Sequence, residues 1–199
     1  IFVGIKNGII TEVKTYKPSD KNKCRKFIDK KDCVLIPGLI NAHTHLAMTL
    51  LRGLEDDTPL ETWLFKRIFP LEGALVSPAF VRAGVELAAR ECLRFGTTTV
   101  NDMYFFTGEA TKIWDRVGLR GVFSQAFSDN KIPEDAVMKD SREERFRKLH
   151  AKYKNHPRID IGLAPHAPYT CSDDVLKKAA DLANELDAIL HIHLSETWK

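Results

Sequence analysis

Short apolar runs alternate with helix-start signals along most of this chain, and this alternation restricts the fold more than any other feature. Five runs have the composition of strands: VLIPGLINAHTH, GTTTVNDMY, LRGVFSQAF, IDIGLAPHAPY and AILHIHLSE. The signals that start helices stand between or beside them, at Thr58-Pro59 with Glu61, Ser77-Pro78, Ser141 with Glu144, and Ser172. Strands that alternate with helices predict a parallel α/β sheet. The first run is continuously apolar, which predicts a strand buried on both faces.

Each of these runs is apolar where it starts and polar where it ends. The polar ends comprise His43, His45, Asn101, Asp102, Gln125, His166, His193 and Glu196. An open doubly wound sheet would gather mainly the residues beside its switch point, and no glycine-rich phosphate loop follows the first run. A (β/α)8 barrel gathers all its strand ends at one mouth, where catalytic residues lie. The pattern therefore favours a TIM-type barrel.

The number of strands is too small for a closed barrel. Residues 37–199 supply about five β/α strands, whereas a barrel has eight strands and about 250 residues. We therefore expect an incomplete barrel, which belongs either to a longer protein or to an assembly with another chain. Before it, IFVGIKNGIITEV contains Asn7-Gly8, which predicts a two-residue hairpin turn and a small N-terminal β element.

The composition is that of a soluble globular chain. It has 199 residues, 44% hydrophobic and 29% charged, with a formal net charge of +3. That charge is too small to indicate a nucleic acid or a membrane as partner. The four cysteines form no CxxC pair, and the sequence contains no signal peptide or apolar stretch of membrane-spanning length. These features predict a cytoplasmic protein.

Two histidine pairs carry the strongest chemical signal. His43 and His45 are two residues apart and therefore point to the same side of a strand, and His191 and His193 repeat this arrangement in HIHLSE. A single HxH pair is more often a pair of hydrogen-bonded core histidines than a metal site. The repetition favours a shared cation held by His43, His45 and His193, with His191 one layer deeper and structural. Neutral imidazole suits zinc, although iron or manganese could use the same ligands.

Several segments together resemble a known family. PGLINAHTH, PLE at residues 70–72, GTTTVNDMY, APHAPYTCS and HIHLSE occur in the order found in the amidohydrolase superfamily, in its cytosine, guanine and adenosine-type aminohydrolase branch. The resemblance implies zinc-dependent hydrolytic deamination of a 6-aminopurine nucleoside, such as methylthioadenosine, S-adenosylhomocysteine or adenosine. It also implies that residues 1–36 belong to a small β-sandwich-like domain and that residues 37–199 form strands one to five of the barrel.

The resemblance also assigns roles to residues. It makes His43, His45 and His193 the ligands of one divalent metal ion and Glu196 the catalytic proton shuttle. Three further residues would bind the small-molecule substrate: Glu72 at the ribose hydroxyls, His166, and Trp63 in the nucleoside pocket. Without the resemblance, Glu72 would be a solvated loop carboxylate. The fourth run ends in His166 and contains no lysine, so the bridging lysine of two-metal relatives is missing and one metal is expected.

Two alternatives remain open at the level of the sequence. The first is another aminohydrolase of the same superfamily, acting on guanine, cytosine or a triazine. The second is a non-catalytic incomplete barrel, because the histidine and aspartate that the family carries on its sixth and eighth strands would lie beyond Lys199. A homo-oligomer or a complementary C-terminal polypeptide would then complete the site.

Overall fold

The computed structural model describes residues 1–30 and 32–196 and divides the chain into two compact units, Ile1–Pro37 and Gly38–Lys199. In the first unit, β1 (Phe2–Lys6) pairs antiparallel with β2 (Ile9–Lys14). Asn7 and Gly8 both have positive φ, 54° and 78°, which confirms the predicted hairpin turn. A 3-10 helix at Pro18–Lys23 follows. Its buried Asp20 forms an ion pair with Lys14, with 2.9 Å between Oδ1 and Nζ.

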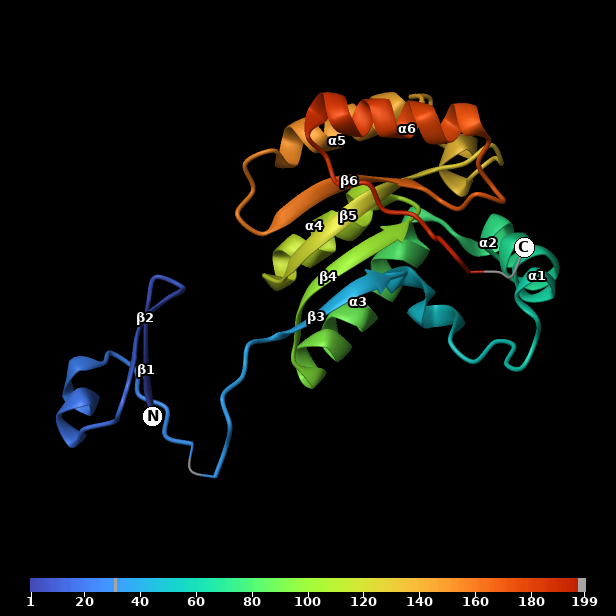
Figure 1. Cartoon of the computed structure of the whole chain (residues 1–199). Coiled ribbons are helices and arrows are strands. Elements are labelled where there is room, and N and C mark those ends of the chain that lie inside the picture. Colours follow the sequence, from blue (N-terminus) through green and yellow to red (C-terminus); the bar gives the residue numbers. More distant parts are fainter. Residues whose placement is uncertain (31, 197–199) are drawn as a thin grey trace. The chain divides into compact units, whose positions relative to one another are not determined.

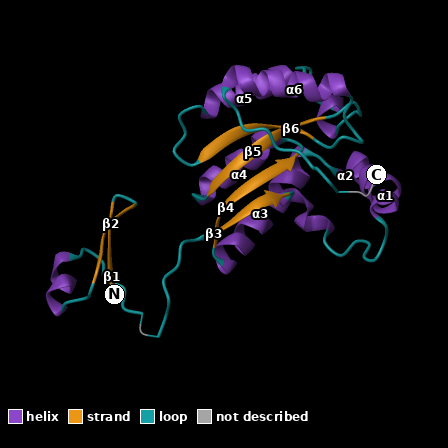
Figure 2. Ribbon diagram, viewed as in Figure 1, coloured by secondary structure: helices purple, strands orange, loops and turns teal. Residues whose placement is uncertain are grey.

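The second unit is built on a parallel sheet, as the alternation predicted. Its strands pair in chain order: β3 (Leu39–Thr44), β4 (Thr97–Tyr104), β5 (Arg120–Phe127) and β6 (Ile159–Pro165). Long helices connect or follow them: α3 (Pro78–Phe95), α4 (Thr107–Val117), α5 (Arg142–Tyr153) and α6 (Asp173–Leu186). Figures 1 and 2 show these helices packed along the sheet. The hydrophobic core lies between the two layers and includes Trp114, Phe123 and Phe146.

Three of the predicted helix starts are confirmed by their caps. The hydroxyls of Ser77, Ser141 and Ser172 accept the N–H groups of the third helical residues of α3, α5 and α6. The helix predicted at Thr58 begins at Leu60 instead, with Pro59 as its N-cap, and the Thr58 hydroxyl donates to the Asp56 carbonyl. This helical stretch comprises α1 (Leu60–Trp63), a π-helical segment (Leu64–Ile68) and α2 (Phe69–Leu75).

Two strand predictions need correction. The first run does not form a strand buried on both faces. Only Leu39–Thr44 is strand, it pairs with β4 along one edge, and the side chain of Ile40 is 72% exposed. The fifth run lies beside β6 but forms one isolated bridge, between Leu190 and Leu163, rather than a strand. Three backbone hydrogen bonds join this run to β6 and the residue after it: Ile189 accepts from Leu163, His191 donates to Leu163, and His193 donates to His166. The described sheet therefore has four strands and not five.

The fifth run reaches β6 closely because of a glycine. A Cβ on Gly162 would lie 2.7 Å from the Ile189 carbonyl oxygen and 2.6 Å from the Ser124 hydroxyl, so any larger residue would push this run away from the sheet.

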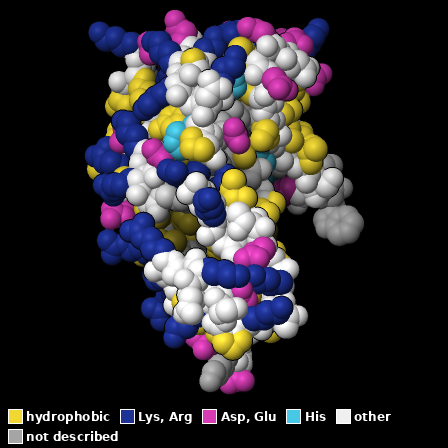
Figure 3. Space-filling model, turned by 90° about the vertical axis from the view of Figure 1, so that its left-hand side faces the viewer, with side chains coloured by type: hydrophobic (Ala, Val, Ile, Leu, Met, Phe, Trp, Pro, Cys, Tyr) yellow, Lys and Arg dark blue, Asp and Glu magenta, His cyan; other side chains and the backbone are white. Residues whose placement is uncertain are grey.

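Apolar side chains lie among charged ones on the face that Figure 3 shows. Among the described residues no single helix could span a membrane, although Leu60–Leu75 and Pro78–Phe95 pass the length and composition test as a pair bent by 110°.

Candidate metal centre

The polar strand ends meet at one edge of the sheet. In Figure 1 the arrowheads of β3 and β4 point to the side where α1 and α2 lie. Parallel strands that follow one another in chain order bring their carboxyl ends to this same edge. The histidines at the end of β3 therefore lie close to those of the segment after α6, although about 150 residues separate them in sequence.

Three imidazoles converge here. One nitrogen of each of His43, His45 and His193 lies within 4.8 Å of the others, and the Nε2 atoms of His43 and His45 are 3.3 Å apart. The ring centroid of His193 lies 4.6 Å from that of His43 and 5.2 Å from that of His45. Within residues 1–30 and 32–196 this is the one cluster of three such side chains that could hold a metal ion.

Hydrogen bonds fix the orientation of these rings. The Nδ1 atom of His45 lies 2.6 Å from the Met103 carbonyl oxygen, which can only accept, so Nδ1 carries the hydrogen and Nε2 keeps its lone pair. The Nδ1 atom of His43 is engaged by His191 Nε2 at 2.8 Å. The backbone N–H of His193 donates to the His166 carbonyl at 2.9 Å. The donor set therefore fits a divalent cation that prefers imidazole, such as zinc.

The protonation states of the histidine rings suit metal binding. Burial lowers the pKa of His45 to about 4 and that of His193 to about 4. Burial has the same effect on the neighbouring His166 and His191, each with a pKa of about 4. All four rings are thus neutral at pH 7, which is the state in which imidazole binds a metal.

Glu196 lies next to this group, on the exposed side. The Tyr169 hydroxyl donates to Glu196 Oε2 at 2.6 Å, while Oε1 has no hydrogen bond within the part of the chain that the structure describes. Both residues line the cleft beside the histidines. The phenol therefore holds one carboxylate oxygen and leaves the other with free acceptor capacity.

Glu72 is neither in a loop nor solvated. It lies in α2, is 6% exposed, and accepts a hydrogen bond of 2.7 Å from the Tyr104 hydroxyl. Burial raises the pKa of Glu72 to about 7, and the bond from Tyr104 opposes this shift. A buried carboxylate with one neutral donor still has unused acceptor capacity, so Glu72 can accept hydrogen bonds from a ligand in the cleft.

A cleft of about 580 Å³ brings the predicted residues together. Its lining includes His45, His193, Glu196, Glu72, His166 and Trp63, whereas His43 lies beside it rather than in the lining. The rest of the wall is mainly apolar and aromatic: Met48, Leu64, Phe65, Ile68, Phe69, Phe105, Phe127, Ile132 and Pro133. Such a volume and lining suit a small organic ligand with a flat ring. His166 is held by a bond of 2.7 Å between its Nδ1 atom and the Thr170 hydroxyl.

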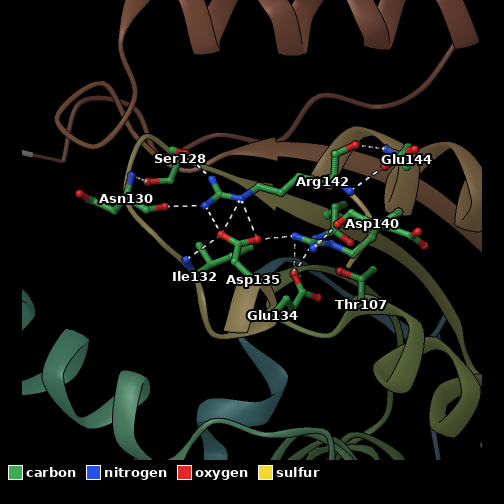
Figure 4. Close-up of polar contacts among 12 residues, drawn as sticks. Thr107, Ser128, Asn130, Ile132, Glu134, Asp135, Asp140, Arg142 and Glu144 are labelled. Atoms are coloured by element: carbon green, nitrogen blue, oxygen red, sulfur yellow. Dashed lines mark hydrogen bonds and ion pairs between the residues drawn. The ribbon is translucent and has the colours of Figure 1, made fainter. Parts of the chain in front are cut away.

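The loop after β5 forms one wall of this cleft. Ser128, Asn130 and Ile132 line it, and Figure 4 shows how Arg142 at the start of α5 holds them. The Arg142 guanidinium donates to the Ser128 and Asn130 carbonyls and to the Asp135 carboxylate. Arg145 also bonds Asp135, at 2.7 Å. The wall is therefore fixed by buried and half-buried ionic contacts before any ligand binds.

Sequence reasoning did not find Tyr104, Tyr169 or the Arg142 contacts. Tyr104 and Tyr169 end two of the strand-like runs, so their position at the strand ends was an available signal. Two polar strand ends have structural contacts instead. Asp102 accepts the Leu46 N–H and the Thr44 hydroxyl, and Gln125 donates to Glu134 at 2.8 Å.

The fold and site define a class: a parallel α/β protein with a histidine centre at the carboxyl ends of its strands. The family model for the Amidohydrolase family matches residues 34–199. The chain belongs to this family.

Individual relatives narrow the similarity. A 5'-deoxyadenosine deaminase of Methanothrix thermoacetophila is 43% identical over 97% of this chain and 44% of its own length. A 5-methylthioadenosine/S-adenosylhomocysteine deaminase of Desulfovibrio desulfuricans is 47% identical over 83% of this chain and 37% of its own. The crystal structure of an adenosine deaminase from Xanthomonas campestris with bound zinc matches with a TM-score of 0.75 and 41% identity, covering 81% of this chain and 37% of that one. The chain spans less than half the length of these relatives.

Proposed function

We propose that the polypeptide carrying this chain is a metal-dependent hydrolase that removes ammonia from a 6-aminopurine nucleoside. The observation that carries the proposal is the convergence of His43, His45 and His193 beside an apolar cleft in a member of the Amidohydrolase family. The names of the relatives favour substrates related to adenosine, with methylthioadenosine, 5'-deoxyadenosine and S-adenosylhomocysteine the first to test.

The proposed cofactor is one divalent ion, zinc in preference to iron or manganese, held by His43, His45 and His193. The neutral rings and the unprotonated Nε2 atom of His45 support this choice, and the similar adenosine deaminase was solved with zinc. When bound, such an ion makes water nucleophilic at neutral pH by lowering its pKa to about 7.

Glu196 is the proposed catalytic residue. As a carboxylic acid it would protonate a purine ring nitrogen while water adds to the neighbouring carbon. The resulting carboxylate would then take up a proton released by that water and deliver it to the departing amine. The bond from Tyr169 supports this role, because it holds one oxygen and leaves the other for the substrate.

Glu72, His166 and Trp63 are the proposed substrate-binding residues. Glu72 would accept the ribose hydroxyls, a role that its burial and its single described donor, Tyr104, support. Trp63 would contact the purine across the cleft, and His166 would donate to or accept from its edge through Nε2, since Nδ1 is engaged by Thr170.

The architecture is part of the same proposal. The four paired strands would be the first four of a (β/α)8 barrel, and the segment after α6 would be the fifth. Residues 1–36 would belong to a small β-sandwich-like domain. The remaining strands, with any further ligands, would come from a longer polypeptide or from another chain. A cytoplasmic location is consistent with the four cysteines, all of which are free.

The test compares substrates with and without ribose. The full natural polypeptide, loaded with zinc, is incubated with methylthioadenosine, 5'-deoxyadenosine, adenine and guanine, and deamination is followed by absorbance. We expect turnover of the nucleosides, and Glu72→Ala should reduce their kcat/KM far more than that of a free base. Glu86→Ala, an exposed carboxylate on α3, is the control. Equal losses on both substrate types would contradict the ribose role, and turnover of guanine alone would contradict the proposed substrate class.

A further inference from the structure

His191 is a buried polar side chain beside the histidine centre. It is 8% exposed, and its backbone N–H donates to the Leu163 carbonyl at 2.8 Å. Its ring contacts His43 edge-on, with Nε2 at 2.8 Å from His43 Nδ1. Its own Nδ1 atom is buried and has no hydrogen-bond partner among the described residues. A purely structural role would be served as well by an apolar side chain of similar size.

The direction of the bond between these rings decides what His43 can do. A neutral imidazole carries one hydrogen, so a ring nitrogen that binds a cation requires the hydrogen to lie on the other nitrogen. His43 Nε2 is the nitrogen that faces His45, at 3.3 Å, and Nδ1 is the nitrogen that faces His191. For Nε2 to offer its lone pair, Nδ1 must donate and His191 Nε2 must accept.

We infer that His191 is a positioning residue that accepts the Nδ1–H of His43 and so aims the lone pair of His43 Nε2 into the metal centre. The inference rests on the proposed metal site. His191 does for His43 what the Met103 carbonyl does for His45, where the corresponding distance is 2.6 Å. The backbone of His191 is held in place by its bond to Leu163 on β6.

This arrangement has a consequence for His191 itself. If its Nε2 accepts, its hydrogen must lie on Nδ1. A carbonyl oxygen can only accept, whereas this imidazole could also donate from Nε2, and His43 would then carry its hydrogen on the nitrogen that faces the centre. The tautomer of His191 therefore determines whether the Nε2 atom of His43 can bind the metal ion.

Substitution tests the role through metal affinity rather than activity. His191→Phe keeps the ring volume and removes the acceptor, whereas the side-chain carbonyl of His191→Gln can reach the place of Nε2. We expect zinc binding, measured by competition with a chelator, to weaken about 10- to 100-fold in His191→Phe, as is usual when an outer hydrogen bond to a metal ligand is lost. His191→Gln should restore most of the affinity. His150→Phe, on α5, is the control and should leave it unchanged.

The outcomes separate this inference from the proposed function. If the wild-type full-length polypeptide takes up no zinc, the proposed metal site fails and the inference with it. If the wild type binds zinc and His191→Phe binds it equally well, the inference is overturned while the metal site stands. Should the variant not fold, long-range ¹H–¹⁵N spectra of the zinc-loaded wild type decide the question. A hydrogen on His43 Nδ1 supports the inference, and a hydrogen on His43 Nε2, or metal bound through Nδ1, overturns it.

Discussion

Two groups of polar side chains lie near the carboxyl ends of the strands, and they differ in how their hydrogen-bonding groups are satisfied. The first is the histidine cluster, made of His43, His45, His191 and His193. The second is the arginine–carboxylate network, made of Gln125, Glu134, Asp135, Arg142 and Arg145 (Figure 4). The network pairs opposite charges and donors with acceptors, as in the bonds from Arg145 to Asp135 at 2.7 Å and from Gln125 to Glu134 at 2.8 Å.

The histidine cluster contains only groups of one kind. The ring of His43 lies edge-on to the rings of His45, His191 and His193, with centroids 4.6–4.9 Å apart. Burial and the charge of a neighbouring histidine lower the pKa of His45, His191 and His193. No carboxylate is hydrogen-bonded to these four rings within the described residues. The comparison shows two uses of clustered polar side chains. A cluster whose donors and acceptors bind one another stabilises the fold. A cluster whose lone pairs point at a common centre requires a bound ligand.

The largest effect should come from breaking the histidine cluster. His45→Asn removes a proposed ligand, so zinc content should fall to a fraction of one ion per chain and deamination should drop by on the order of 10³-fold or more. Metal analysis and the absorbance assay measure the two quantities. His150→Asn is the control. A variant with full zinc content and activity would show that His45 is not a ligand.

Glu196→Gln should separate metal binding from catalysis. The amide keeps the shape of the side chain but cannot exchange a proton in the same way, so kcat should fall by about 10²- to 10⁴-fold. Zinc content should not change. The two measurements are those used for His45, with Glu86→Gln as the matched surface variant. Normal turnover in Glu196→Gln would remove the carboxylate from the mechanism.

In the arginine–carboxylate network, substitution should cost stability and spare the metal. Asp135→Asn leaves the buried Arg145 without its closest carboxylate, which should lower the free energy of unfolding by about 2 kcal/mol. Urea denaturation measures this loss. Asp140→Asn breaks an exposed pair with Lys148 and should cost less than about 1 kcal/mol. Loss of zinc in Asp135→Asn without loss of stability would contradict the division between the two groups.

The contribution of Asp135 should also depend on pH. Burial alone would raise the pKa of Asp135, but the bonds from Arg142 and Arg145 outweigh it and lower the pKa from 3.8 to about 2. A carboxyl with a lower pKa in the folded state stabilises the fold fully above pH 3.8 and loses this effect as the pH falls through 2. The stability difference between wild type and Asp135→Asn should therefore shrink over this range. A difference that grows on acidification would contradict the assignment.

The smallest effect should come from Tyr104→Phe. This change removes the 2.7 Å bond to Glu72 and leaves the ring in place. A hydrogen bond of about 1 kcal/mol corresponds to roughly a fivefold rise in KM for a nucleoside. Tyr153→Phe, at the buried end of α5, is the control. An unchanged KM would show that Tyr104 does not hold Glu72 for the substrate.

The sequence predicted the parts of this molecule that depend on local periodicity. The spacing of His43 and His45 brings the two rings together at the end of β3, with their Nε2 atoms 3.3 Å apart, and the serine caps define the starts of three helices. Strand order places the strand ends together. These features follow from local backbone geometry, which residues close in sequence determine.

The features that the sequence did not predict depend on distant contacts. Glu72 is buried where α2 meets Tyr104 on β4, and the side chains of Leu39 and Ile40 on β3 are exposed although the run is apolar. Asp102 and Gln125 end their strands as His43 does, yet both are used up by neighbours. A polar strand end alone therefore does not distinguish a ligand from a structural residue.

The measurement that tests the central claim most directly is a zinc titration of the metal-free full polypeptide with deamination of methylthioadenosine recorded at each step. The account predicts no turnover without metal, a linear rise in rate that stops at one zinc per chain, and no rise in His45→Asn. Full activity of the metal-free protein, or an identical titration curve for His45→Asn, would contradict the claim that His43, His45 and His193 form the catalytic metal centre.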